Sequence, residues 1–146
     1  MIMTLIIEDA LVGEDLASVL KERRFDVRHA RNFFNAVDII EEDIEQKFDT
    51  IILDLAMPIR GLPDEAKEDA KKIFPGWAFY KYVLNNKAEL QKSTIFLSGF
   101  ADEFRHRMRD NGLEYIYNSL NVVSKGDPQC ITKVINFVRT RGQSFR

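Results

Sequence analysis

Short apolar runs that end in polar or charged residues recur along the 146-residue chain, and they constrain its fold more than any other feature. Four such runs are Leu5–Ile7, Thr50–Leu53, Thr94–Leu97 and Leu120–Ser124. Each of them ends in a polar side chain or is followed directly by one. Continuous apolar runs of this length are typical of parallel strands that helices cover on both faces. A weaker strand is predicted at Asp26–His29.

Amphipathic segments with helical spacing separate these runs. The predicted apolar stripes are Leu11, Leu16, Val19 and Leu20; Phe34, Val37, Ile40 and Ile44; and Ile131, Val134, Ile135 and Val138. Strand and helix therefore alternate about five times, which predicts a doubly wound α/β fold around a five-stranded parallel sheet. In such a sheet the carboxyl ends of all strands meet at one edge, where ligands bind.

The polar residues that follow the strands should gather at that edge. They are Glu8, Asp9, Asp54, Ser98 and Lys125. Three neighbouring carboxylates repel one another unless a cation lies among them, and oxygen ligands favour Mg²⁺. An Asp carboxylate beside Mg²⁺ is a competent nucleophile toward phosphorus, and a lysine and a hydroxyl can stabilise the transferred group. The pattern thus predicts phosphoryl transfer to Asp54, assisted by Lys125 and Ser98.

Each of these residues has a simpler interpretation when taken alone. Asp9 or Asp54 can be a helix N-cap, Ser98 a turn residue, Lys125 a solvated lysine and Glu8 a surface acid. The combination favours the site, because chance would otherwise have to place the same chemistry at the ends of four strands.

Four strings of the sequence resemble the receiver domains of bacterial response regulators. They are Leu5–Asp9, Ile51–Pro58, Leu97–Gly99 and Val123–Lys125. The resemblance covers nearly the whole chain and implies a CheY-like fold in which Asp54 is the phosphoacceptor. It also implies that Asp9 binds Mg²⁺ directly, that Glu8 does so through water, and that the backbone carbonyl of Ala56 is a further metal ligand.

The function that this resemblance implies is that of a single receiver domain, 1–146. Such a domain accepts a phosphoryl group from a histidine kinase or phosphotransfer protein and signals through a downstream protein partner. We expect a phosphoacceptor rather than an enzyme, with slow autodephosphorylation at most, because apolar Ala56 and Phe100 flank the pocket. The alternative is a receiver-like interaction module that does not depend on phosphorylation.

Three features depart from the receiver pattern. Val122 stands where receivers usually have an aromatic residue that reports phosphorylation, and Tyr115 or Tyr117 in the preceding loop is a candidate substitute. A charged helical insertion is predicted at 59–76, between the third strand and the third helix. Only the tail 140–146 follows the last helix, so we expect a stand-alone receiver.

Composition narrows the location and the partners. A formal net charge of −2 leaves no global positive field that would hold nucleic acid. No apolar run is long enough to span a membrane, no basic leader precedes the first run, and the single Cys130 excludes an internal disulfide. These features predict a cytoplasmic protein that binds neither nucleic acid nor membrane.

The segment after Ser98 carries a basic cluster. Its members are Arg105, His106, Arg107 and Arg109. We interpret this cluster as an ordinary solvated face. Receivers commonly use the same region to contact a partner or a second copy, so a homodimer is the alternative interpretation.

Overall fold

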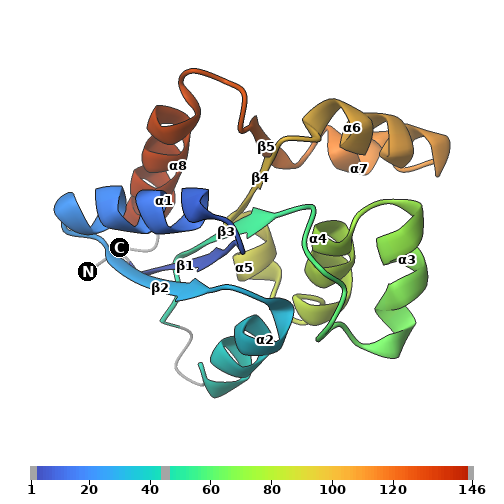
Figure 1. Cartoon of the computed structure of the whole chain (residues 1–146), viewed down its shortest axis with the longest axis horizontal. Coiled ribbons are helices and arrows are strands. Elements are labelled where there is room, and N and C mark those ends of the chain that lie inside the picture. The colour runs from blue at the N-terminus through green and yellow to red at the C-terminus, as the bar shows by residue number, and fades with distance from the viewer. Residues whose placement is uncertain (1–2, 44–46, 145–146) are drawn as a thin grey trace.

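The structure, a computed structural model, describes residues 3–43 and 47–144. Its centre is one parallel sheet (Figure 1) with the strand order β2-β1-β3-β4-β5. The strands are β1 (Met3–Ile7), β2 (Asp26–Ala30), β3 (Thr50–Asp54), β4 (Thr94–Ser98) and β5 (Asn121–Ser124). The chain winds outward from β1 to β2 and then back past β1 toward β5, so the predicted doubly wound fold is confirmed.

Helices cover both faces of this sheet. They are α1 (Leu11–Glu22), α2 (Phe33–Glu42), α4 (Pro75–Ala78), α5 (Ala88–Lys92), α6 (Ala101–Asp110), α7 (Glu114–Tyr117) and α8 (Cys130–Ser144). Figure 1 shows α1 and α8 together on one face, with α2, α4 and α5 across the sheet from them. None of the described helices is long and apolar enough to cross a bilayer.

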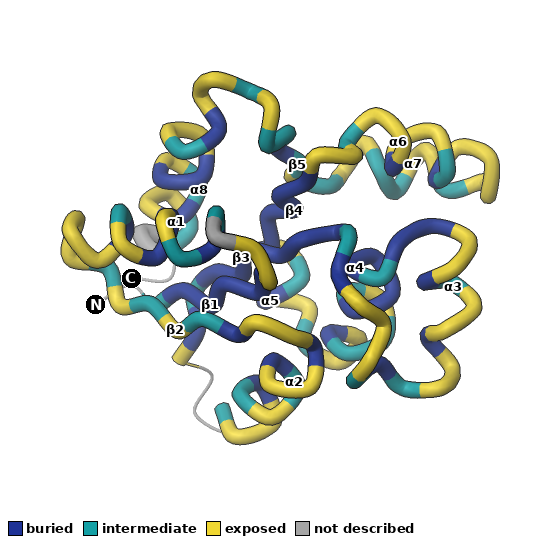
Figure 2. The backbone as a smooth tube through the Cα atoms, viewed as in Figure 1, coloured by how far each residue is buried: buried dark blue, intermediate teal, exposed yellow. Residues whose placement is uncertain are grey.

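Alternate residues of the inner strands enter two separate cores, because successive side chains of a strand point to opposite faces. Ile6 and Ile52 pack in the core that α1 and α8 cover. Leu5 and Phe96 pack in the opposite core with residues from α2, α4 and α6. The strands β1, β3 and β4 are therefore buried on both sides, as Figure 2 shows, and this explains why their sequences are continuous apolar runs.

Helix α2 differs from the predicted apolar stripe. Phe34, expected to face the core, is 60% exposed, and its neighbour Phe33 is buried instead. The side chain of the N-cap residue Asn32 accepts a hydrogen bond from the Asn35 N–H, which fixes where the helix begins and turns Phe33 inward. Ile44, the last residue of that stripe, lies outside the described residues.

The segment predicted as a helical insertion, 59–76, is largely helical. It contains a single 3₁₀ turn, η1 (Asp64–Ala66), and a short helix, α3 (Lys67–Lys72). Pro75 then begins α4 at the first helical position, where its fixed φ favours a helix and its missing N–H costs nothing. A π-helical turn, η2 (Phe79–Val83), follows α4.

The predicted tail after the last helix is shorter than expected. Helix α8 runs to Ser144, so most of the segment 140–146 continues the helix, and residues 145–146 lie outside the described part of the chain. Within this extension, Arg141 donates a hydrogen bond to the carbonyl of Lys92 across 2.5 Å.

Candidate functional site

Three carboxylates meet at the carboxyl edge of the sheet. Glu8 and Asp9 follow β1, Asp54 ends β3, and one carboxylate oxygen of each lies within 4.8 Å of the other two. Strand register produces this proximity, because Ile7 pairs with Leu53 and the next residue of each strand is acidic. The side chains of Glu8 and Asp54 are buried, with 1% and 4% exposure, and Asp9 lies at the exposed rim.

Backbone contacts hold the carboxylate of Asp54 in place. Its Oδ1 accepts a hydrogen bond from the Ala56 N–H (3.2 Å). Gly76, in the first turn of α4, donates its N–H to the Leu55 carbonyl (2.8 Å), and a Cβ at Gly76 would lie 2.4 Å from the backbone oxygen of Asp54. Only glycine fits this approach, so α4 supports the acidic loop directly.

Among the described residues, Lys125 is the one whose ammonium group lies between the two buried carboxylates. Its Nζ lies 2.9 Å from Glu8 Oε2 and 3.5 Å from Asp54 Oδ2. No described donor gives Glu8 Oε2 a well-aligned hydrogen bond, so this ion pair is its compensation. Three carboxylates facing one ammonium leave the cluster with excess negative charge.

Burial shifts the pKa values of this pair. Desolvation raises the pKa of Glu8 to about 7, with a further rise from the neighbouring Asp54 that Lys125 partly offsets. Desolvation acts to lower the pKa of Lys125, but the two carboxylates outweigh it and the pKa is raised. The lysine therefore stays charged at neutral pH, whereas Glu8 titrates near neutrality unless another cation joins the cluster.

The donor set fits a hard divalent cation. All three side chains supply oxygen, two of them are buried, and their charge exceeds what Lys125 neutralises. Ala56 lies half-buried next to the phosphoacceptor candidate, and the role of its carbonyl as a further ligand stays a prediction.

Ser98 is fully buried at the end of β4. Its Oγ accepts a hydrogen bond from the Phe100 N–H (2.9 Å), as a turn residue would. Its backbone carbonyl accepts one from the Lys125 N–H (2.9 Å), which joins the ends of β4 and β5. Because Oγ is the acceptor in the first bond, its own proton remains available to a ligand.

The structure also tests the simpler interpretation of each residue. Glu8 is no surface acid, since it is buried. Helix α1 begins after Ala10 without a side-chain cap, so Asp9 does not cap it. The side chain of Lys125 is 26% exposed and doubly paired rather than solvated, whereas the turn role of Ser98 is real and coexists with its place at the site.

Near the site, β5 lacks an aromatic residue where receivers usually have one. Val122 is half-buried and pairs in register with Phe96 of β4. Of the two tyrosines proposed as substitutes, Tyr115 is 73% exposed. Tyr117 is half-buried and packs edge-on against Phe104, with 5.4 Å between ring centroids. Only Tyr117 is therefore coupled to the core.

The basic cluster of α6 is not uniformly solvated. Arg107 donates a hydrogen bond to the Ile73 carbonyl (2.7 Å), and its guanidinium lies 4.4 Å from the centre of the Phe74 ring. Arg105 and Arg109 are exposed, as expected. No local sequence pattern predicts the Arg107 contact, because its partners lie more than 30 residues away on the segment before α4.

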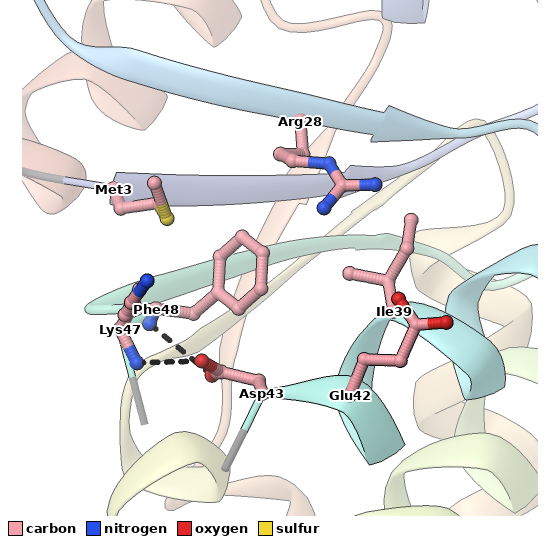
Figure 3. A pocket seen from close by; sticks show the side chains of 7 residues that line it. All are labelled: Met3, Arg28, Ile39, Glu42, Asp43, Lys47 and Phe48. Atoms are coloured by element: carbon pink, nitrogen blue, oxygen red, sulfur yellow. Dashed lines mark hydrogen bonds between the residues drawn. The ribbon is translucent and has the colours of Figure 1, made fainter. Parts of the chain in front are cut away.

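The cavity drawn in Figure 3 lies at the other end of the sheet. It has a volume of about 370 Å³ and opens near the start of β1 and β3. Its lining residues are Met3, Arg28, Ile39, Glu42, Asp43, Lys47 and Phe48. The acidic cluster and this cavity are thus separated by the length of the strands.

Comparison with known proteins places the fold. No protein-family model and no curated protein matches the chain. The receiver domain of a Francisella response regulator matches with a TM-score of 0.67 and 17% identity over 100% of both chains. A receiver domain from Clostridium thermocellum matches with a TM-score of 0.67 and 15% identity, covering 99% of this chain and 96% of that one. The chain has the receiver-domain fold.

A third receiver-fold structure, a response regulator protein from Burkholderia pseudomallei, matches with a TM-score of 0.63 and 18% identity. The alignment covers 99% of this chain and 71% of that one. That structure contains a phosphorylated aspartic acid, a calcium ion and citrate. The resemblance to receivers, inferred from four short strings, is confirmed at the level of the fold. What the site can do chemically must be argued from its own side chains.

Proposed function

We propose that this chain is a two-component receiver that accepts a phosphoryl group on Asp54 in a Mg²⁺-dependent reaction. The observation that carries the proposal is the pair of buried carboxylates, Glu8 and Asp54, that share one ammonium at the carboxyl edge of a receiver fold. Burying like charges is costly, and a purely structural pocket gains nothing from it. A site that binds a cation and a phosphoryl group explains why the charges are there.

In the proposed reaction a carboxylate oxygen of Asp54 attacks phosphorus. The bond between phosphorus and the donor atom breaks, and its electron pair leaves with the donor. The hydrogen bond from the Ala56 N–H limits rotation of the carboxylate. Lys125, 3.5 Å from Oδ2, is placed to pair with the transferred phosphoryl oxygens, and the Ser98 hydroxyl is the second candidate donor to them.

Mg²⁺ would be held by Asp9 and Asp54 directly, by Glu8 through water, and by the carbonyl of Ala56. When bound, the ion neutralises charge on the phosphoryl oxygens. The phosphorylated aspartic acid and calcium ion in the Burkholderia pseudomallei structure support both parts of the proposal. The source of the phosphoryl group would be a histidine kinase or phosphotransfer protein, and the signal would pass to a downstream protein partner.

The chain would act as a phosphoacceptor rather than as an enzyme with turnover. Phe100 is half-exposed beside the pocket, and neither it nor Ala56 carries a side-chain group that positions a hydrolytic water. We therefore expect slow autodephosphorylation, measured as loss of the phosphoryl mass after the donor is removed. A lifetime of a few seconds would contradict this expectation. The cytoplasmic location stays a prediction.

A second candidate function is an interaction module that works without phosphorylation. Half-buried Val122 favours it, because an aliphatic side chain cannot report phosphorylation as a rotating ring does. A discriminating measurement is partner capture by wild type and Asp54→Asn under identical conditions. Equal capture with and without phosphoryl donor would favour the module.

The direct test of the main proposal is incubation with Mg²⁺ and a small acyl-phosphate donor, followed by intact mass measurement. Wild type should gain one phosphoryl mass, and Asp54→Asn should gain none. Asp43→Asn is a matched control, because Asp43 lies at the opposite end of the sheet and should leave the adduct unchanged. If wild type gained no phosphoryl mass with any of several donors, the proposal would be wrong.

A further inference from the structure

We infer that His29 is a positioning residue for the acidic cluster and that it acts through the peptide of Glu8. The inference rests on the proposed metal-dependent function of that cluster. His29 belongs to β2, the edge strand beside β1, and its side chain is half-buried. Its Nε2 lies 2.7 Å from the backbone oxygen of Glu8. A carbonyl oxygen only accepts hydrogen bonds, so Nε2 carries the proton in this contact.

The contact extends the pairing of β1 with β2 beyond the last regular pair, Ile7 with Ala30. The Glu8 N–H donates to the Ala30 carbonyl (3.1 Å), and the Glu8 carbonyl then accepts from the His29 side chain. Both polar groups of the Glu8 peptide are therefore bound to β2. This matters because Glu8 is the first residue after the strand, where the backbone would otherwise turn freely.

Helix α1 reinforces the same contact. A Cβ at Gly13 would lie 2.8 Å from Glu8 Cγ and 2.8 Å from His29 Nε2. Gly13 therefore lets α1 close over the imidazole and the glutamate side chain together. Any larger residue at this position would displace the glutamate side chain or the imidazole.

The side chain of Glu8 is held at its other end as well. Its Oε1 accepts a hydrogen bond from the Ala10 N–H (3.1 Å), and its Oε2 pairs with Lys125 (2.9 Å). With the peptide held by β2 and the carboxylate by Ala10 and Lys125, the glutamate has one orientation. The Glu8 carbonyl that His29 binds belongs to the peptide bond with Asp9. His29 therefore also helps to orient the backbone from which the Asp9 side chain extends.

The test compares two substitutions of His29. His29→Leu keeps a side chain of similar reach but removes the donor, whereas His29→Gln keeps an N–H donor. We expect His29→Leu to weaken Mg²⁺ binding about tenfold, the lower end of the effect seen for groups that orient metal ligands, and His29→Gln to restore most of it. His106→Leu is the matched control, because His106 is the second of the two histidines and lies exposed on α6.

Two measurements distinguish a failure of the His29 inference from a failure of the proposed function. Calorimetric titration with Mg²⁺ gives the affinity, and hydrogen exchange at the Ala10 N–H reports the Glu8 carboxylate without metal. If wild type binds no Mg²⁺, the proposed function fails while the exchange experiment still tests the inference. Faster exchange at Ala10 in His29→Leu, restored in His29→Gln, supports it. Equal affinities and equal exchange in wild type and His29→Leu overturn it, whatever the change in thermal stability.

Gly13→Ala tests whether displacing the Glu8 side chain and the His29 imidazole weakens the site, although alanine favours a helix over glycine. We expect the same weakening of Mg²⁺ binding and the same faster exchange at Ala10, because the added Cβ displaces Glu8 and His29 together. Unchanged values in Gly13→Ala count against the inference.

Discussion

The two ends of the same sheet treat charge in opposite ways. At the amino end, Arg28 and Glu42 are exposed around an open cavity, where water solvates them. At the carboxyl end, Glu8 and Asp54 are almost fully buried and share the ammonium of Lys125. The two ends belong to the same sheet and differ in how far their charges are buried.

The difference shows at which end of the sheet charge costs folding stability. Solvated rim charges contribute little to stability in either direction, whereas a buried carboxylate costs free energy unless a cation compensates it. The raised pKa of Glu8, about 7 because of desolvation, is the signature of that cost. Groups with perturbed pKa values occur often at functional sites, and Glu8 and Lys125 lie together at the carboxyl end of the sheet.

The largest effect should come from removing the cation of the carboxyl end. Lys125→Met should slow phosphoryl uptake from an acyl-phosphate donor about 100-fold, the usual consequence of losing one preorganised charge at a reaction centre. Arg28→Met, which removes a cation from the amino end, should leave the rate within twofold. Time courses of intact mass at fixed Mg²⁺ measure both. A similar decrease in the two variants would show that the reaction does not depend on the carboxyl end in particular.

Mg²⁺ should stabilise the protein through the carboxyl end alone. At a Mg²⁺ concentration about 100 times the dissociation constant, the free energy of unfolding should rise by about 2.7 kcal/mol. Thermal unfolding with and without Mg²⁺ measures this. Asp9→Asn should reduce the shift strongly and Asp43→Asn should keep it. An equal loss in both variants would place the ion elsewhere.

The pH dependence of metal-free stability should differ between the two ends. The pKa of Glu8 rises from 4.5 to about 7 on folding, so between these values the folded state binds more protons than the unfolded state. The Glu8 contribution to the free energy of unfolding therefore increases as pH falls from 8 toward 4.5, and is lost as pH rises through 7.

Glu8→Gln should remove this slope and raise the midpoint of thermal unfolding at pH 8, because the cost of burying an ionised carboxylate at this position is gone. Glu42→Gln, at the exposed amino end, should keep the wild-type slope. Denaturant titrations at several pH values give the measurement. A persistent slope in Glu8→Gln would assign the titration to another group.

The smallest effect should come from the buried hydroxyls near the amino end. Thr4 and Thr50 pair in register, both are fully buried, and neither Oγ1 has a hydrogen-bond partner among the residues that the structure describes. Replacing both with Val should change the free energy of unfolding by about 1 kcal/mol or less, toward greater stability, since no bond is lost. Phosphoryl uptake should not change. A loss of several kcal/mol would reveal a partner for these hydroxyls.

The sequence predicted the layers of the fold well because burial on both faces leaves a direct mark on composition. The apolar runs of β1, β3 and β4 could not suit a strand with a solvated face. Helix α2 was predicted less well, since Phe33 and Phe34 fit an apolar stripe equally, and the position of the N-cap decided which one entered the core.

The sequence predicted that the three carboxylates meet at one edge of the sheet, but not which contacts hold them there. Parallel register alone brings Glu8 beside Asp54, so the carboxylate cluster follows from the strand assignment. The contact of Arg107 with Ile73 and the contact of His29 with Glu8 follow from no local pattern. Each joins residues more than 20 positions apart through side-chain geometry.

The sequence alone therefore specifies the residue types of each strand: apolar side chains along it and an acidic, hydroxyl or basic side chain at its end. The contacts that position these end residues depend on the fold, because distances and burial come from packing between elements that are distant in sequence. Gly13 and Gly76 show this most clearly, since no local sequence pattern predicts that each permits a helix to pack directly against an acidic residue.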